Sequence, residues 1–220
     1  MSFDLTKQKS SGGFKQPLLE VGTAPARLVR IIDLGIQPQQ AFEGKDKPPA
    51  HMVDWTWELV DVFMVDKDGN EDESKPRWIS EQFPLHNPKA DLAKSTKRCN
   101  AVDPDKKLNY QMDKYIGLPA MVTIGHKVSK GNTYANVLNV GPMRPKDIEK
   151  CPELKNEPVV FTLDEPDMEI FKSFPDWLKE RIMGNLEFKG SKLDKALNGD
   201  KASEPEQDEQ EPENGEQEAW

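Results

Sequence analysis

GLPAMVTIGHKVSKGNTYANVLNV, the stretch formed by residues 117–140, contains two β-strand patterns separated by a turn. Residues 117–127 and 133–140 are rich in apolar and β-branched side chains, which favour strands. Between them, Val128–Asn132 contains a Gly-Asn pair, which is typical of the short turns that close β-hairpins. The stretch therefore predicts a basic hairpin that bears an aromatic residue, Tyr134, and that completes a small all-β unit.

Three further strands are expected before this hairpin. They cover residues 26–35, 51–65 and 77–85, which are dense in Val, Ile, Trp and Phe. Asp68-Gly69 predicts a tight turn between the second and third strands. The second and third strands therefore form a hairpin of their own.

A helix is expected between the third and fourth strands, over residues 87–98. Asn87 is a good N-cap, and Pro88 occupies the first helical position, where proline is favoured. A second helical turn or two is expected within residues 108–116. The order strand, strand, strand, helix, strand, strand is that of an OB-fold, a five-stranded barrel whose helix falls between strands three and four.

The rest of the chain flanks this domain, which is assigned to residues 25–145. Residues 1–24 are expected to form a flexible N-terminal arm, in which Pro17-Leu18-Leu19 docks locally. Residues 146–186 form a C-terminal extension. Residues 187–220 are expected to be a disordered acidic tail, because periodicity is lost and Glu, Gln, Pro and Asp dominate.

Two elements are expected in the C-terminal extension, a short strand at residues 158–163 and an amphipathic helix at residues 174–184. Trp177, Leu178 and Ile182 fall at helical spacing, and Gly184 stands where helices often end. The apolar face packs either on the barrel or on another subunit, which leaves a homo-oligomer open. The fold class is therefore mainly β, with a C-terminal helical extension.

Charge is distributed unevenly along the chain. The 220 residues have a formal net charge of -9. Residues 201–220 contain eight acidic residues and one Lys, so they contribute -7 and leave -2 for residues 1–200. A nearly neutral body is compatible with nucleic-acid binding, whereas the acid is concentrated in the tail.

The remaining composition excludes several classes of site. Cys99 and Cys151 have no metal-ligand spacing, and none of the three His lies near a Cys, so no metal or cofactor is expected. No apolar run approaches the roughly 18 residues of a membrane span. No signal peptide is visible. The sequence predicts a soluble cytoplasmic protein.

Single-strand binding requires cations for the phosphates and flat side chains for the bases. Ile79, Glu81 and Phe83 share the face of the third strand that is expected to turn inward, so Trp78 faces outward, where it either stacks on a base or is buried under a loop. Trp57 is assigned to the core, whereas for Trp55 the core and the barrel mouth both stay open. The candidate binding residues are Arg27, Arg30, Phe42, Lys45, Lys47, Trp55, Arg77, Trp78, Lys127, Lys130 and Tyr134.

The acidic tail has two interpretations. It is either a solubilising end or a mimic of nucleic acid that competes for the basic groove and presents its last aromatic to partner proteins. Trp220 favours the second interpretation, because an aromatic on a polar tail has no structural purpose. Glu216, Glu218 and Trp220 are the candidate contacts.

Four stretches carry a resemblance to a known family: residues 25–34, 54–65, 78–85 with the following helix, and 117–143. In this order they resemble the single-stranded DNA-binding proteins encoded by tailed bacteriophages. The resemblance implies an OB-fold with an acidic C-terminal tail, binding of single-stranded DNA in replication or recombination, and recruitment of replication or recombination proteins through the tail. The resemblance also implies that the protein is located in the cytoplasm of the host cell. The tail departs from the family in ending with Trp, where Phe is commoner, and in using Glu and Gln, where Asp is commoner.

Two other functional classes are weighed. Pro166-Asp167 or Pro175-Asp176, followed by Glu187-Phe188-Lys189, imitates the set with which some nucleases hold a divalent metal. That chemistry requires neighbouring strands, whereas a helix and a tail are expected here, so no catalytic residue is assigned and the chain is not expected to be an enzyme. The other class is a protein–protein adaptor built on the same barrel.

Overall fold

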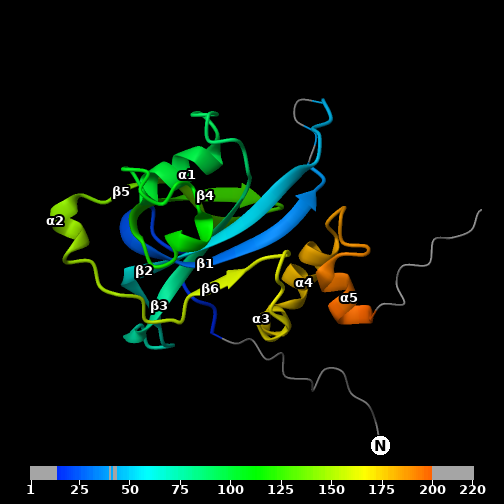
Figure 1. Ribbon diagram of the computed structural model, residues 1–220. Helices are drawn as coiled ribbons and strands as arrows, with labels where there is room; N and C mark the ends of the chain where they lie inside the picture. The colour runs from blue at the N-terminus through cyan, green and yellow to red at the C-terminus, as the bar shows by residue number, and fades with distance from the viewer. Residues whose placement is uncertain (1–13, 40, 42–43, 200–220) are drawn as a thin grey trace, which may run out of the picture.

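Six strands form one sheet in the computed structural model, which describes residues 14–39, 41 and 44–199. The strands are β1 (Gly22–Gln37), β2 (Ala50–Val65), β3 (Glu71–Pro84), β4 (Pro119–Ser129), β5 (Asn132–Pro142) and β6 (Val159–Phe161). The helical segments are α1 (Lys94–Val102), η2 (Met112–Tyr115), α2 (Pro145–Ile148), α3 (Met168–Ser173), α4 (Asp176–Met183) and α5 (Lys192–Asn198). Figure 1 shows α1 beside the main strands and α3, α4 and α5 gathered together next to β6. The expected mainly β class is confirmed.

The strands pair in the order β3-β2-β1-β4-β5, and each pair on this path is antiparallel. β3 and β5, the two ends of the path, therefore both run in the direction of β1. β6 adds to β1 in parallel at Arg30–Ile32. The sheet thus contains the five strands expected for the barrel and the short strand expected after it, β6, but in the described part of the chain no ladder joins β3 to β5, so the expected closed barrel is not confirmed.

One hydrophobic core is shared by all five main strands, α1 and η2. Trp55 and Trp57 from β2 lie at its centre, both fully enclosed, and Trp55 makes edge-to-face contacts with Trp57, Phe83 and Tyr115. Such contacts add to the stabilisation from buried apolar area. Because β3 and β5 contribute to the same core as β1, the two ends of the sheet lie near each other across it.

Arg98 of α1 bridges these two ends. Its guanidinium donates to both carboxylate oxygens of Glu81 on β3, at 2.8 and 3.0 Å, and to the side-chain oxygen of Asn139 on β5, at 3.4 Å. The line along which β3 and β5 approach each other is called here the seam. α1 therefore bridges the seam at the level of Glu81.

β1 is buried on both faces, because a second core covers its later half. Ile32 and Leu34 pack against Phe161, Phe171 and other apolar residues of β6, α3, α4 and α5. Gly35 allows a close approach here: its φ is +69°, and a Cβ at this position would lie 2.8 Å from both Asn185 and Leu163.

The prediction of a helix at residues 87–98 is wrong about where the helix begins. Asn87 uses its side-chain oxygen to accept from the Lys89 backbone N–H at 3.0 Å, which forms a local turn, and the helix begins only at Lys94. Asn favours this alternative because its short side chain competes for nearby backbone groups. The expected strands and the helix at 174–184 are confirmed, with bounds shifted by a few residues.

The expected disorder from residue 187 is also wrong as far as residue 199. α5 lies within this range, and its Leu193 is fully buried in the second core. Ser191 caps the helix by accepting from the Asp194 N–H at 3.1 Å. A short helix with one apolar anchor leaves little periodicity in the sequence, which explains the error.

Candidate nucleic-acid interface

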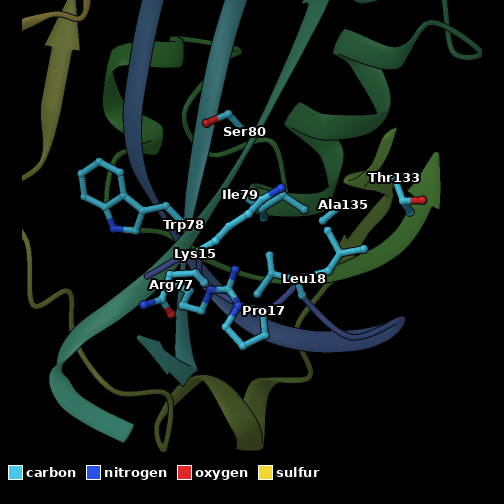
Figure 2. A pocket seen from close by; sticks show the side chains of 11 residues that line it. Lys15, Pro17, Leu18, Arg77, Trp78, Ile79, Ser80, Thr133 and Ala135 are labelled. Atoms are coloured by element: carbon cyan, nitrogen blue, oxygen red, sulfur yellow. The ribbon is translucent and has the colours of Figure 1, made fainter. Parts of the chain in front are cut away.

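Trp78 on β3 lies between two hollows in the surface. Its side chain is 41% exposed, whereas its neighbour Ile79 is buried, as the alternation of the strand predicts. Figure 2 shows the indole of Trp78 projecting from β3 on the side away from Ile79. A fixed and exposed indole is a platform on which a flat ligand can stack.

The first hollow, here the seam hollow, has a volume of about 530 Å³ and lies between β3, β5 and the segment that precedes β1 (Figure 2). Its lining residues are Lys15–Leu19, Arg77–Ser80, Thr133 and Ala135. The second, here the turn hollow, has a volume of about 520 Å³ and is lined by Gln16, Met64, Ser74–Trp78 and Asn156. The two hollows share Gln16, Arg77 and Trp78, so they adjoin at these three residues, and together they are called here the trough.

The Trp78 ring is oriented by the buried carboxylate of Glu58 on β2. The indole N–H donates to Glu58 Oε2 at 3.3 Å. Glu58 also accepts from the backbone N–H groups of Lys155 and Asn156, at 2.7 and 3.2 Å, and from the Asn156 side chain at 2.6 Å. One carboxylate therefore holds both the aromatic platform and the connector between β5 and β6 that borders the turn hollow.

Arg30 of β1 lies over the Trp78 ring, with its guanidinium carbon 5.9 Å from the ring centroid. The same side chain donates to Thr56 at 3.1 Å and lies 3.6 Å from Asp54. Burial raises the pKa of Asp54, and the hydrogen bond from Gln82 and the charge of Arg30 oppose that rise. The outer face of β2 is thus a buried polar layer that supports Trp78.

Arg77 is the cation common to both hollows. It is half-buried, and burial lowers its pKa, but a guanidinium starts so high that it stays charged at neutral pH. Lys15 adds a second cation in the seam hollow, and Lys75 a third in the turn hollow. Lys75 also pairs with Asp72 at 2.7 Å, so it contributes less net positive charge than the other two.

Arg27 does not belong to this surface. Its buried guanidinium donates to the carbonyl oxygens of Gly117, Cys151 and Pro152 and pairs with Glu153 at 3.0 Å. It therefore ties the connector after β5 to β1, and the prediction that it contacts nucleic acid is corrected.

Trp55 does not belong to it either. The ring is fully enclosed in the main core, so of the two alternatives for Trp55 the core is correct. Its indole N–H has no hydrogen-bond partner within the described residues. A side chain with no exposed surface cannot stack on a base, and Trp55 is withdrawn from the candidate site.

The β4–β5 hairpin presents Lys127, Lys130 and Tyr134 to solvent, with Tyr134 51% exposed. Lys127 lies directly opposite Tyr134 in the ladder. Thr133 and Ala135 line the seam hollow, so Tyr134, between them, points to the other face of β5. These three residues form a separate exposed group beside the trough.

The loop between β1 and β2 contributes nothing to the two hollows among its described residues. Lys45 and Lys47 are exposed, but neither lines a hollow. Phe42 lies outside the described residues, as do Glu216, Glu218 and Trp220 of the tail. Of the predicted residues, Arg77 and Trp78 therefore line the trough, and Arg30 lies over the Trp78 ring.

Among the polar residues that sequence reasoning missed, Lys15, Gln16 and Lys75 line the trough, and Glu58 orients the Trp78 ring. The first two fall in the expected flexible arm, where the only signal was the apolar run at Pro17–Leu19. Leu19 of that run is buried, which confirms local docking. Glu58 is an acidic residue, which by itself does not indicate a phosphate-binding surface, and only the fold shows that its carboxylate accepts hydrogen bonds from Trp78, Lys155 and Asn156.

The residues of the nuclease-like pattern have other roles here. Asp167 caps α3 by accepting from the N–H groups of Glu169 and Ile170, and Asp176 begins α4. Within residues 14–39, 41 and 44–199, His, Cys, Asp and Glu side chains form no group of three suited to a metal ion. None of the helices in this part of the chain has the length and apolar character needed to cross a bilayer.

Comparison with models of known protein families gives no match for this chain. Comparison with curated protein sequences gives none either.

Proposed function

We propose that this protein binds single-stranded DNA without sequence specificity, along the trough at Trp78. The observation that carries the proposal is an oriented, 41% exposed indole between two hollows that share Arg77. Stacking on an aromatic ring is tolerant of sequence, because every base has a flat face, and it contributes about 1–3 kcal/mol per base. The cations Arg77, Lys15 and Lys75 bind the phosphates between stacked bases.

The fold supports the same proposal. We assign the sheet to the OB type, since its strand order, the position of α1 between β3 and β4 in the sequence, and the Arg98 bridge across the seam suit a barrel closed between β3 and β5. OB-folds bind oligonucleotides on the strand 2–3 face, and Trp78 lies on β3. On this proposal the biological setting is phage replication or recombination, with the acidic tail recruiting partner proteins.

Fluorescence tests the proposal. Titration with oligo-dT is expected to quench the emission of Trp78, and Trp78→Phe to remove that quenching. Trp177→Phe is the matched control, because Trp177 is 55% exposed on α4 and lines neither hollow. Trp55 and Trp57 are enclosed and do not contribute to the change.

Affinity gives the second measurement. Trp78→Ala is expected to weaken oligo-dT binding by about 1–3 kcal/mol, the contribution of one stacked base. Duplex DNA of equal length is expected to bind far more weakly, since its bases are not free to stack. Absence of both quenching and binding at low salt would refute the proposal and favour the adaptor.

A further inference from the structure

The segment Lys15–Leu19, which precedes β1, is fixed to the sheet at two points. The Gln16 side chain donates to the Val65 carbonyl at 2.7 Å and accepts from the Val65 N–H at 3.0 Å, so it pairs with the backbone as a neighbouring strand would. Three residues later, Leu19 is buried in the main core, and its carbonyl oxygen lies 2.7 Å from His126 Nε2 on β4. The segment is therefore part of the fold rather than a flexible arm.

Between these two anchors the segment faces the seam hollow instead of filling it. Pro17 and Leu18 line the hollow together with Lys15, and Leu18 remains 41% exposed (Figure 2). The opposite walls come from Arg77–Ser80 of β3 and from Thr133 and Ala135 of β5. The hollow thus has two walls, one from the sheet and one from the N-terminal segment.

The chemistry of these walls suits one kind of occupant. Lys15 and Arg77 provide positive charge, Pro17 and Leu18 provide apolar surface, and Ser80 and Thr133 provide hydroxyl groups. A volume of about 530 Å³ lies within the usual range of small-ligand sites, roughly 300–1,000 Å³. An unpaired nucleotide matches these walls, because its backbone is negatively charged and its base is flat and partly apolar.

We propose that Lys15–Leu19 forms the outer wall of the nucleic-acid site and that the seam hollow receives one unpaired nucleotide, adjacent to the one stacked on Trp78. Lys15 and Arg77 bind its phosphate, and Pro17 and Leu18 pack on its sugar and base. This inference rests on the proposed function and deepens it. It also gives a reason for selection of single strands, because a paired base cannot enter between the two walls.

Two substitutions in the segment test the proposal by different physical routes. Lys15→Ala is expected to weaken oligo-dT binding about three- to tenfold at low salt and to reduce the salt slope, d log K/d log [salt], by about 0.7, the value for one phosphate contact on a single strand. Gln16→Ala removes the Val65 anchor but no charge. It is expected to weaken binding about three- to tenfold, through the cost of ordering the wall, with the slope unchanged.

The matched control is Lys146→Ala, which removes one Lys from α2, outside both hollows. It should leave affinity and slope unchanged, and thermal melting of each variant checks that the fold is retained. If Lys15→Ala and Gln16→Ala both keep the wild-type affinity and salt slope while Trp78→Ala still binds more weakly, the proposed wall is wrong. The proposed function then stands. Tighter binding by Gln16→Ala would also overturn the wall, because the segment would then cover the site. If the wild-type protein binds no oligo-dT, the proposed function fails and this inference with it.

Discussion

Glu81 is a carboxylate in the interior of the molecule, and its surroundings explain how the core tolerates it. It is 5% exposed, and it accepts from Arg98, Lys94 and the indole N–H of Trp57. A buried charge is costly unless its hydrogen-bonding capacity is filled, and here several donors fill it. Because Arg98 also reaches Asn139 on β5, this single pair links α1, β3 and β5.

Arg98→Met is therefore expected to destabilise the protein strongly. The free energy of unfolding should fall by about 3 kcal/mol, the lower end for breaking a buried pair, because Lys94 and Trp57 still donate to Glu81. Urea denaturation measures the change. The double variant Glu81→Met with Arg98→Met should recover most of the loss, since it leaves no buried charge without a partner, and Lys94, whose side chain is 40% exposed, is solvated by water.

The control for this prediction is an ion pair in which the acidic partner is exposed. Glu153→Gln removes the partner of Arg27, but the Glu153 side chain is 86% exposed and Arg27 keeps its three backbone acceptors. A change below about 1 kcal/mol is expected. Equal losses for Arg98→Met and Glu153→Gln would show that burial does not determine the strength of these pairs.

At the scale of elements, β1 is the strand on which both cores depend. Its first half pairs with β4 and its later half with β6, while β2 lies along most of its length. The β6–α5 region therefore completes the burial of β1 and is not an independent appendage. Ile32 and Leu34 would be exposed without it.

Leu193→Ala on α5 tests this dependence. Leu193 is fully buried in the second core, so the substitution is expected to cost about 2–5 kcal/mol of unfolding free energy. Leu197→Ala on the same helix is the matched control, because Leu197 is 38% exposed. Thermal denaturation compares the two variants. A melting temperature for Leu193→Ala as high as that for Leu197→Ala would mean that α5 contributes nothing to the fold.

At the scale of the whole molecule, charge is distributed unevenly along the chain. The formal net charge is -9, of which residues 201–220 carry -7. The trough, by contrast, contains Lys15, Lys75 and Arg77. On the proposed function, an acidic segment tethered to the same chain is expected to compete with DNA for the trough at a high effective concentration.

Deletion of residues 201–220 is accordingly expected to tighten oligo-dT binding, most strongly at low salt, where electrostatic competition is least screened. Equilibrium titration at two salt concentrations measures the change. A full-length variant in which the eight tail acids are replaced by Gln or Asn should show the same gain, which separates charge from length. Unchanged or weaker binding after deletion would contradict the competition.

The strand pattern was readable from the sequence because it depends on local chemistry. Alternation correctly placed Ile79 inside and Trp78 outside, and the Gly-Asn turn at Gly131-Asn132 correctly joined β4 to β5. Periodicity and turn residues act over a few positions, so a single sequence contains them in full. The mainly β class follows from these signals alone.

Only the tertiary structure decided which polar residues line the surface hollows and which hold the molecule together. Arg27 and Arg77 look alike in the sequence, yet one binds backbone carbonyls in the interior and the other lines both hollows. Lys15–Leu19 became a wall through contacts with Val65 and His126, which lie 49 and 107 residues away from their partners. Local patterns determine strands and turns, whereas burial and the walls of a site arise from contacts between residues distant in the chain.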